Sequence, residues 1–362
     1  MVRPAIGLVF VRVVGLLFTT ILTVSAFSVQ AETDQAPSGQ ASSDQASSVW
    51  LPPSLTVQWE NDMFVGTDRH YTNGLRATAS FTRANTPTTI EDALQTFSHL
   101  TGKSLQPQWF TAGIGQDMYT PDNKTATALI PDDRPYAGWL YLSISAHKLS
   151  SCWTSSNDNP DCLDSVEANL GVVGPAAYAK ETQDFVHSAR GIARFQGWQN
   201  QLKNEPGFIM TWERKKRWVA PPEAGWGYDL IPNIGASLGN VLTQVNAGAM
   251  MRFGFNIPHD FGAPSAIKPI ANLPFLQDRR WGMYYFIGAD GRFVAHNIFL
   301  DGNTFTNSHS VTRKPWVYDI PQGIAITKGP YRLSLARVFR SKEFDGQQKN
   351  TQFSSLTLTI KF

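Results

Sequence analysis

Residues 356–362 read Leu356-Thr-Leu-Thr-Ile-Lys-Phe362, and this stretch decides the fold class. Leucine, isoleucine and phenylalanine occupy every second position, and threonine and lysine lie between them. An extended chain therefore presents one apolar and one polar face. A polar face this regular argues against a strand buried on both sides. Two structures remain, a half-solvated sheet of a soluble protein and a tilted strand of a membrane barrel.

The same alternation recurs along the chain in segments of about ten residues, the length that a tilted membrane strand needs. We predict twelve strands, an even number, as in bacterial single-chain barrels. They cover 53–61, 72–82, 109–117, 137–148, 163–173, 207–217, 224–238, 242–255, 281–294, 316–327, 330–341 and 352–362. The predicted fold is all-β, a transmembrane antiparallel barrel with short helices in the loops.

The first 31 residues have the composition of an export signal. Two arginines accompany an apolar run over 13–24, and small residues precede a cleavage point after Ala31. The run is short for a spanning helix of ~20 residues, so a membrane anchor is the less favoured alternative. Residues 32–50 have almost nothing to bury, which predicts a disordered lead. Residues 51–362 then form one domain, the barrel.

The C-terminal aromatic and the export signal together resemble the features of bacterial outer-membrane barrels, which predicts that location and a barrel-assembly machinery as partner. The net charge is only +2, and the basic run 213–217 is more typical of a solvated strand end than of a nucleic-acid patch. No nucleic-acid partner is expected. Cys152 and Cys162 are the only cysteines, and so close a pair in an exported chain predicts a disulfide rather than a metal site.

With the N-terminus in the periplasm, every connection from an odd to an even strand faces outward. The loops near 62–71, 118–136, 174–206, 295–315 and 342–351 then share one rim. Residues 83–108, partly in helical spacing, fall on the opposite side and predict a short capping helix. All candidate site residues lie on the outer rim.

The first candidate is Glu60-Asn61-Asp62 with 67–74, which supplies carboxylate, amide and carbonyl oxygens. Such oxygens are the ligands of a hard cation, most simply calcium. A loop of Asx turns explains the same composition equally well. The second candidate is Arg134, after Asp132 and Asp133. Its guanidinium can clamp a phosphate or stabilise an oxyanion, or form an ordinary rim salt bridge.

The third candidate is the pair Gln183 and His187, which a helical spacing of four places on one face. The loop that carries them exceeds thirty residues, a length that calls for a function or for disorder. A lone exposed histidine is usually without function, but an acidic cluster on the same rim favours a general base. The fourth candidate, His296 to Asp301 with Glu343, is expected to support the site or to form turns.

No nucleophilic serine lies at a strand-to-helix elbow, because the Gly-x-Ser-x-Gly stretch at 235–239 falls at the end of a predicted strand, and no glycine-rich phosphate loop occurs. The absence of the elbow favours an attacking water over an acyl-enzyme. The simplest scheme is a water activated by His187, with a cation that polarises the carbonyl.

Taken together, eight spaced motifs resemble the outer-membrane lipid A 3′-O-deacylase family, over the chain from about Leu55 to Phe362. They are Asn61-Asp62, Tyr71-Thr72-Asn-Gly74, Asp133-Arg-Pro-Tyr-Ala-Gly138, Gly174-Pro, Gln183-x-x-x-His187, Gly197-Trp with Gln201-Leu, Asn297-x-x-Leu-Asp301-Gly and Glu343-Phe. The resemblance implies a twelve-stranded barrel that removes the 3′-linked acyloxyacyl group of lipid A by calcium-dependent ester hydrolysis.

The resemblance also implies roles for individual residues. Asn61 and Asp62 would hold the calcium ion, and His187 would be the base with Gln183 beside it, in a mechanism similar to that of calcium-dependent secreted phospholipases A2. The family's site includes a hydroxyl and a basic residue, for which Thr72 and Arg134 are the candidates. An arginine in place of the expected lysine puts a proton-handling role in doubt. Glu205 is a further candidate carboxylate for the metal.

Two other functions remain alternatives. An outer-membrane phospholipase A is also a twelve-stranded lipid esterase, but it uses a serine nucleophile that we do not find in this sequence. A barrel without catalysis, such as a porin or a surface-binding module, is favoured if the rim motifs are only turns.

Overall fold

The computed structural model describes residues 54–62, 70–82, 109–152, 161–262 and 281–362. The predicted signal peptide (1–31), the disordered lead (32–50) and the helix in 83–108 lie outside the described residues. All of the strands belong to one compact unit, Leu51–Lys361.

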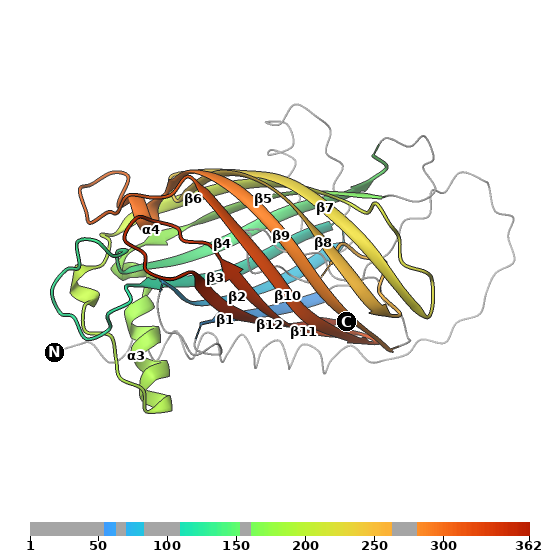
Figure 1. The fold of residues 1–362 in the computed structure, drawn as a ribbon, viewed down its shortest axis with the longest axis horizontal. Helices are drawn as coiled ribbons and strands as arrows, with labels where there is room; N and C mark the ends of the chain where they lie inside the picture. Colours follow the sequence, from blue (N-terminus) through green and yellow to red (C-terminus); the bar gives the residue numbers. More distant parts are fainter. Residues whose placement is uncertain (1–53, 63–69, 83–108, 153–160, 263–280) are drawn as a thin grey trace, which may run out of the picture. The chain divides into compact units, whose positions relative to one another are not determined.

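Twelve strands form a closed antiparallel barrel in which each strand pairs with its sequence neighbours and β1 pairs with β12 (Figure 1). They are β1 (Ser54–Asn61), β2 (His70–Thr82), β3 (Trp109–Thr120), β4 (Ala137–Ser150), β5 (Cys162–Val173), β6 (Glu205–Lys216), β7 (Trp226–Leu238), β8 (Leu242–Phe255), β9 (Trp281–Asn297), β10 (Trp316–Lys328), β11 (Tyr331–Arg340) and β12 (Thr351–Lys361). The predicted fold class and strand number are confirmed. The predicted ends differ most at β3 and β9, which run on to Thr120 and Asn297.

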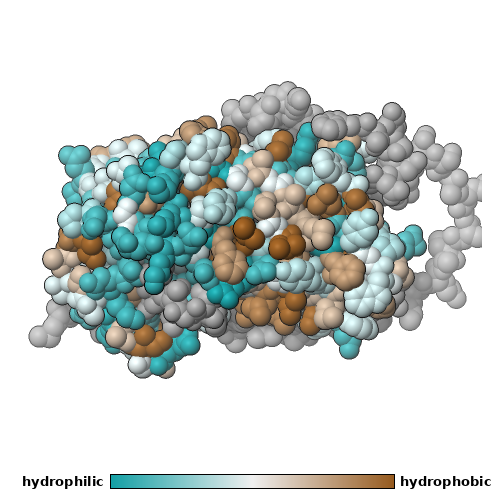
Figure 2. Space-filling model, in the orientation of Figure 1, coloured by the Kyte–Doolittle hydropathy of each residue, from teal (hydrophilic) through white to brown (hydrophobic). Residues whose placement is uncertain are grey.

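Alternation explains why these segments form a barrel that is apolar outside and polar inside. In β12, Leu356 and Leu358 are 36% and 40% exposed, whereas Thr357 and Thr359 are buried in the lumen. Hydrophobic side chains gather over the strands, and mostly hydrophilic ones cover the end that carries α3 (Figure 2). The aromatic residues at strand ends divide between the two faces: Trp281 and Tyr285 are exposed, whereas Trp139 and Tyr284 fill the lumen.

The connections β1–β2, β3–β4, β5–β6, β7–β8, β9–β10 and β11–β12 meet at one end of the barrel, which we call the α3 end. Its helical segments are η3 (Pro175–Ala177), α3 (Ala179–Arg190), η4 (Trp198–Asn200) and α4 (Ile298–Asp301). The described part of the chain contains no helix long and apolar enough to span a membrane. The sequence prediction that all candidate site residues share one rim is confirmed by this topology.

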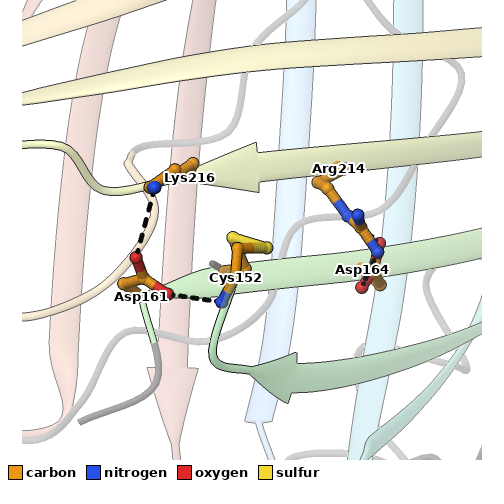
Figure 3. Close-up of a disulfide and its surroundings, with 6 residues drawn as sticks. Cys152, Asp161, Asp164, Arg214 and Lys216 are labelled. Atoms are coloured by element: carbon orange, nitrogen blue, oxygen red, sulfur yellow. Dashed lines mark hydrogen bonds and ion pairs between the residues drawn. A yellow bond between two sulfur atoms is a disulfide. The ribbon is translucent and has the colours of Figure 1, made fainter. Parts of the chain in front are cut away.

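At the opposite end, the far end, Cys152 and Cys162 form the predicted disulfide between β4 and β5 (Figure 3). The basic run beside it is paired with acidic groups. Arg214 donates to Asp164 through Nε and Nη2, at 2.7 and 2.9 Å, and Lys216 lies 3.6 Å from Asp161. The run is therefore a strand end in ion pairs, as predicted.

A second far-end feature is a network around Asp260, in the connection after β8. Its carboxylate accepts hydrogen bonds from Arg252 and from Arg332, the latter at 2.8 Å. Nearby Ile257 packs with Tyr284 and other lumen-facing side chains. The described part of this connection, residues 256–262, is thus held against the lumen by charge-assisted hydrogen bonds.

Candidate active site

Pairing of β1 with β2 brings together three of the predicted site residues. The backbone N–H of Asp62 donates to the carbonyl of Thr72 at 3.3 Å, and the Asn61 amide donates to the Asn73 side chain at 3.0 Å. The Asp62 side chain is fully buried. A register shift between Tyr71 and Asn73 leaves Thr72 as the extra residue of a β-bulge, a feature that is common beside active sites.

The hydroxyl of Thr72 lies 2.7 Å from that of Thr120, at the end of β3. Asp62, Thr72 and Thr120 therefore offer carboxylate, carbonyl and hydroxyl oxygens within one hydrogen-bonded group. Hard oxygen ligands of this kind suit calcium. The residues present fit the cation that the sequence predicts, and the cation site itself stays a prediction.

Helix α3 carries the predicted pair Gln183 and His187, and the residue on each side of it has the left-handed backbone conformation. Tyr178 (φ 56°) precedes it, and Gly191 (φ 66°) caps its C-terminus with a backbone N–H directed at the last turn. Only three helix residues are buried: Ala179, Gln183 and His187. The predicted helical face is confirmed, and it is turned toward the protein and not toward solvent.

The imidazole of His187 is fixed by the chain that follows the helix. Its Nδ1 lies 2.7 Å from the carbonyl oxygen of Ala193, and its ring packs against Phe195. A carbonyl oxygen can only accept, so Nδ1 carries a proton. In the neutral form of the side chain, Nε2 is then the basic nitrogen.

The side chain of Gln183 is oriented by Trp198, whose Nε1 donates to the amide oxygen at 2.8 Å. The amide nitrogen is buried and has no hydrogen-bond partner within the residues that the structure describes. Buried donors are normally paired, so this nitrogen is available to a water or a substrate atom.

Small residues let α3 approach the barrel wall. A Cβ on Gly138, at the start of β4, would lie 2.6 Å from the Cβ of Ala179. Ala179 packs in a buried cluster with Met118 of β3 and Trp198. The buried face of α3 thus lies over β3 and β4, and Met118 of β3 is paired with Asn73, the neighbour of Thr72 in β2.

Arg134, in the β3–β4 connection, lies next to this group and is 1% exposed. Its guanidinium stacks on Tyr119 at 4.7 Å, and its Nη1 donates to Glu343 at 3.4 Å. Its ion pair is thus with Glu343, whereas Asp133 accepts from the backbone amides of Asp122 and Arg134. Nε and Nη2 of Arg134 have no hydrogen-bond partner among the described residues.

Two carboxylates of the rim have shifted pKa values for different reasons. Burial raises the pKa of Asp133, and the two backbone amides only partly oppose that effect. Burial acts in the same direction on Glu343, but the charges of Arg340 and Arg134 outweigh it and hold its pKa below the ordinary value. Glu343 is therefore the anion that Arg134 and Arg340 share.

Glu205, the weakest metal candidate, has its oxygens engaged by loop donors. They accept from the side chains of Asn240 and Asn303 and from the backbone amides of Thr304 and Phe305, at 3.0–3.4 Å. This is the environment of a carboxylate that ties the β9–β10 connection to β6. Its role in metal binding stays a prediction.

The fourth predicted cluster also joins connections. Asp301 accepts from the backbone amide of Asn297 at 2.8 Å and from Arg313 at 3.0 Å, and its carboxylate lies 3.2 Å from His296. Burial would raise the pKa of Asp301, but hydrogen bonds from His296, Asn297 and Arg313 hold it below its ordinary value. These contacts fix the loop that carries α4.

Sequence reasoning missed a lumenal cavity of about 140 Å³ beneath the rim. One wall is charged and includes Glu60, Asp117 and Arg340, and another is apolar and includes Trp139 and Phe299. Tyr119 and Glu343, the two neighbours of Arg134, also line it, so the arginine lies at its edge. Charged residues at lumen-facing strand positions were a signal for it, but their convergence depends on barrel closure.

Comparison with known proteins gives a family model and a solved structure. A model described as "Outer membrane protein LpxR" matches residues 16–362. The structure of LpxR from Salmonella typhimurium is similar with a TM-score of 0.68 and 20% identity, covering 85% of this chain and 100% of that chain. At this identity the similarity shows the fold.

Other solved barrels are more distant. The β domain of the Bordetella autotransporter BrkA gives a TM-score of 0.40 at 9% identity, covering 86% of this chain and 99% of that one. The translocator domain of NalP from Neisseria meningitidis gives 0.37 at 10%, covering 86% and 88%. No curated protein matches the chain.

Proposed function

This chain belongs to the LpxR outer membrane protein family, and on that premise we propose that it is a calcium-dependent esterase that removes the 3′-linked acyloxyacyl chain of lipid A. The twelve-stranded barrel lies in the outer membrane. The substrate is then a lipid of the same membrane, the lipid A of lipopolysaccharide, and the α3 end is where hydrolysis occurs.

One observation carries the proposal: the buried face of α3 presents a histidine whose Nδ1 is held by a backbone carbonyl, beside an amide donor. Nδ1 of His187 is committed to the Ala193 carbonyl, so Nε2 is the atom that can take a proton from water. Gln183, one helical turn before it, has its amide oxygen committed to Trp198. Its amide nitrogen is the remaining group that can orient the water or the ester.

The remaining candidates supply the electrophilic side. Asp62 and Asn61 would hold calcium with help from Thr72, since these residues are buried and joined by backbone hydrogen bonds. When bound, the cation would polarise the ester carbonyl and stabilise negative charge on its oxygen. A base on one element and a cation on another is the arrangement that water-mediated ester hydrolysis requires.

The bonds and protons of the reaction balance without a further reactant. The water oxygen bonds to the ester carbonyl carbon while its proton passes to Nε2 of His187. The bond between that carbon and the sugar oxygen then breaks, and the proton held on His187 neutralises the leaving alkoxide. The products are a free acyloxyacyl acid and lipid A with a 3′-hydroxyl.

Mass spectrometry of lipid A after incubation with the purified barrel tests the proposal. With calcium we expect the loss of one acyloxyacyl unit from the 3′ position, and with a chelator we expect intact lipid A. Release of fatty acid from phospholipid with lipid A intact would favour a phospholipase, and no change in either lipid would favour a barrel without catalysis.

The Asp62→Asn variant tests the cation separately. It removes a charge and keeps the side-chain size, and we expect kcat/KM to fall by about 10²–10³, the cost of losing one oxyanion-stabilising group. Asp345→Asn is the matched control, because Asp345 is an exposed α3-end carboxylate paired with Lys314. Equal activity of the two variants would contradict the calcium role of Asp62.

A further inference from the structure

Arg134 differs from two other arginines of the barrel, Arg214 and Arg340, in the hydrogen bonds that Nε and Nη2 of the guanidinium donate. In Arg214, Nε and Nη2 donate side-on to the two oxygens of Asp164, at 2.7 and 2.9 Å. In Arg340, the same two nitrogens donate to the two oxygens of Asp319, at 2.9 and 3.2 Å. In Arg134, Nε and Nη2 are both buried and unpartnered among the described residues. The pair of nitrogens that binds a carboxylate in Arg214 and Arg340, which we call the fork, thus has no partner in Arg134 among the described residues.

The charges around Arg134 leave the same deficit. A chain of ion pairs runs from the lumen to the rim through Arg292, Asp319, Arg340, Glu343 and Arg134. These ion pairs join three guanidinium groups and two carboxylates, so one positive charge has no ion-pair partner among them, although the charge of Arg134 also acts on the nearby carboxylate of Asp133. Burial of an uncompensated charge is costly, and a bound anion removes that cost.

The position of Arg134 rules out a purely surface role. Its side chain is buried, it stacks on Tyr119, and it is held from one side by Glu343 through Nη1. Both neighbours line the lumenal cavity. Its β3–β4 connection also packs against the segment after α3, where Leu202 donates its backbone N–H to Tyr136 at 2.9 Å. The fork of Arg134 is therefore held rigidly in the same end of the barrel as His187.

We propose that the Nε and Nη2 fork of Arg134 binds a two-oxygen anion of the substrate lipid, a phosphate monoester or a carboxylate, and so makes Arg134 a specificity-determining residue. Arginine suits this task because its planar fork matches both groups bidentately, and because its charge does not titrate. Glu343 is a positioning residue, since it fixes Nη1 and leaves the other edge for the ligand. This inference rests on the proposed function only in taking lipid A as the ligand.

The test measures binding by the full-length barrel in detergent, in the presence of a chelator, so that hydrolysis does not intervene. Three ligands are compared: lipid A, lipid A without its sugar phosphates, and lipid A extended by an acidic core sugar. Arg134→Gln removes the fork and the charge, and Arg134→Lys keeps the charge without the fork. Arg214→Gln is the matched control, because it makes the same change at a side-on arginine of the far end. Heat-modifiable migration confirms that each variant is folded.

We expect Arg134→Gln to weaken binding of the anionic ligand by about 10- to 100-fold, the equivalent of one charge-assisted hydrogen-bonded group. Removal of the responsible anion should weaken binding to the wild type by a similar factor and hardly affect Arg134→Gln. Arg134→Lys should lie between the two, and Arg214→Gln should match the wild type. Dependence on the phosphate or on the sugar acid identifies which group occupies the fork.

The inference is overturned if Arg134→Gln and the wild type discriminate among the three ligands to the same extent. It is also overturned if Arg134→Lys binds all three as tightly as the wild type, because a fork would then be unnecessary. These outcomes are separate from the proposed esterase activity. A barrel that binds lipid A through Arg134 but never hydrolyses it would contradict only the proposed function.

Discussion

Two buried arginines, one at each end of the barrel, lie against a tyrosine ring and differ in how their donors are used. Arg252 stacks on Tyr284 at the far end, and Arg134 stacks on Tyr119 at the α3 end. All three guanidinium nitrogens of Arg252 donate, to Asp229, to Asp260 and to a backbone carbonyl. In Arg134 only Nη1 donates, at 3.4 Å.

The difference separates a structural ion pair from a functional one. Around Arg252 the protein supplies two carboxylates as counter-charges, and they help to hold the described part of the connection after β8 against the lumen. At the α3 end the protein leaves donors of Arg134 and Gln183 without protein partners. Buried polar groups that a fold leaves unsatisfied are costly, and they are typical of sites where a ligand completes the set.

The largest effect is expected when the two arginines are each replaced by methionine, which keeps most of the side-chain volume. Arg252→Met should lower the free energy of unfolding by about 3–5 kcal/mol, because it leaves buried carboxylates short of their cation. Arg134→Met should lower it by about 1 kcal/mol or less, the value of a single weak hydrogen bond. Urea titrations of the refolded barrel in lipid vesicles measure both. Equal losses would remove the distinction between the two ends.

A smaller effect is expected at Gln183. Gln183→Leu should lower kcat/KM by about 3- to 10-fold, since one hydrogen bond from the amide nitrogen to a neutral ligand group is lost. Trp198→Phe removes only the donor that orients the amide oxygen and is the matched control. If Trp198→Phe were the more damaging change, Gln183 would serve packing and not the substrate.

The smallest effect concerns Asp301, whose pKa is held below its ordinary value in the folded protein. Its contribution to stability is complete above the aspartate pKa of the unfolded chain, about 3.9, and is lost as the pH falls through the depressed folded value. The hydrogen bond with Asp301 also raises the pKa of His296, so the difference in melting temperature between the wild type and Asp301→Asn should grow as the pH falls through the pKa of His296 and shrink again below about pH 4. A difference that does not change between neutral pH and pH 4 would contradict the pairing of Asp301 with His296.

The strands were predictable because each carries its own signal. The alternation in 356–362 and in the other strands depends on local chemistry alone. With an even number of strands, β1 and β12 run antiparallel where the barrel closes. The helical face of Gln183 and His187 was predictable for the same reason, since a spacing of four is a property of any helix.

The contacts between loops were not predictable, because they depend on where each strand ends on the rim. That position is determined by the tilt and register of the strands in the closed barrel. A rim salt bridge of Arg134 with Asp132 or Asp133 was one of the alternatives, but the carboxylate that accepts from Arg134 is Glu343, more than two hundred positions later. The lumenal cavity likewise arises from residues that only the closed barrel brings together. The contact of His187 with the Ala193 carbonyl is local, but it depends on the path of the chain after α3, for which the sequence has no periodic signal.

The rate of lipid A deacylation by His187→Ala, measured in calcium beside the wild type, tests the central claim most directly. Glu181→Ala is the control, because Glu181 lies on the exposed face of the same helix. We predict that His187→Ala remains a folded, heat-modifiable barrel and loses about 10²–10⁴ of the rate, the usual contribution of a general base. A folded His187→Ala barrel that deacylates lipid A as fast as the Glu181→Ala control would contradict the claim.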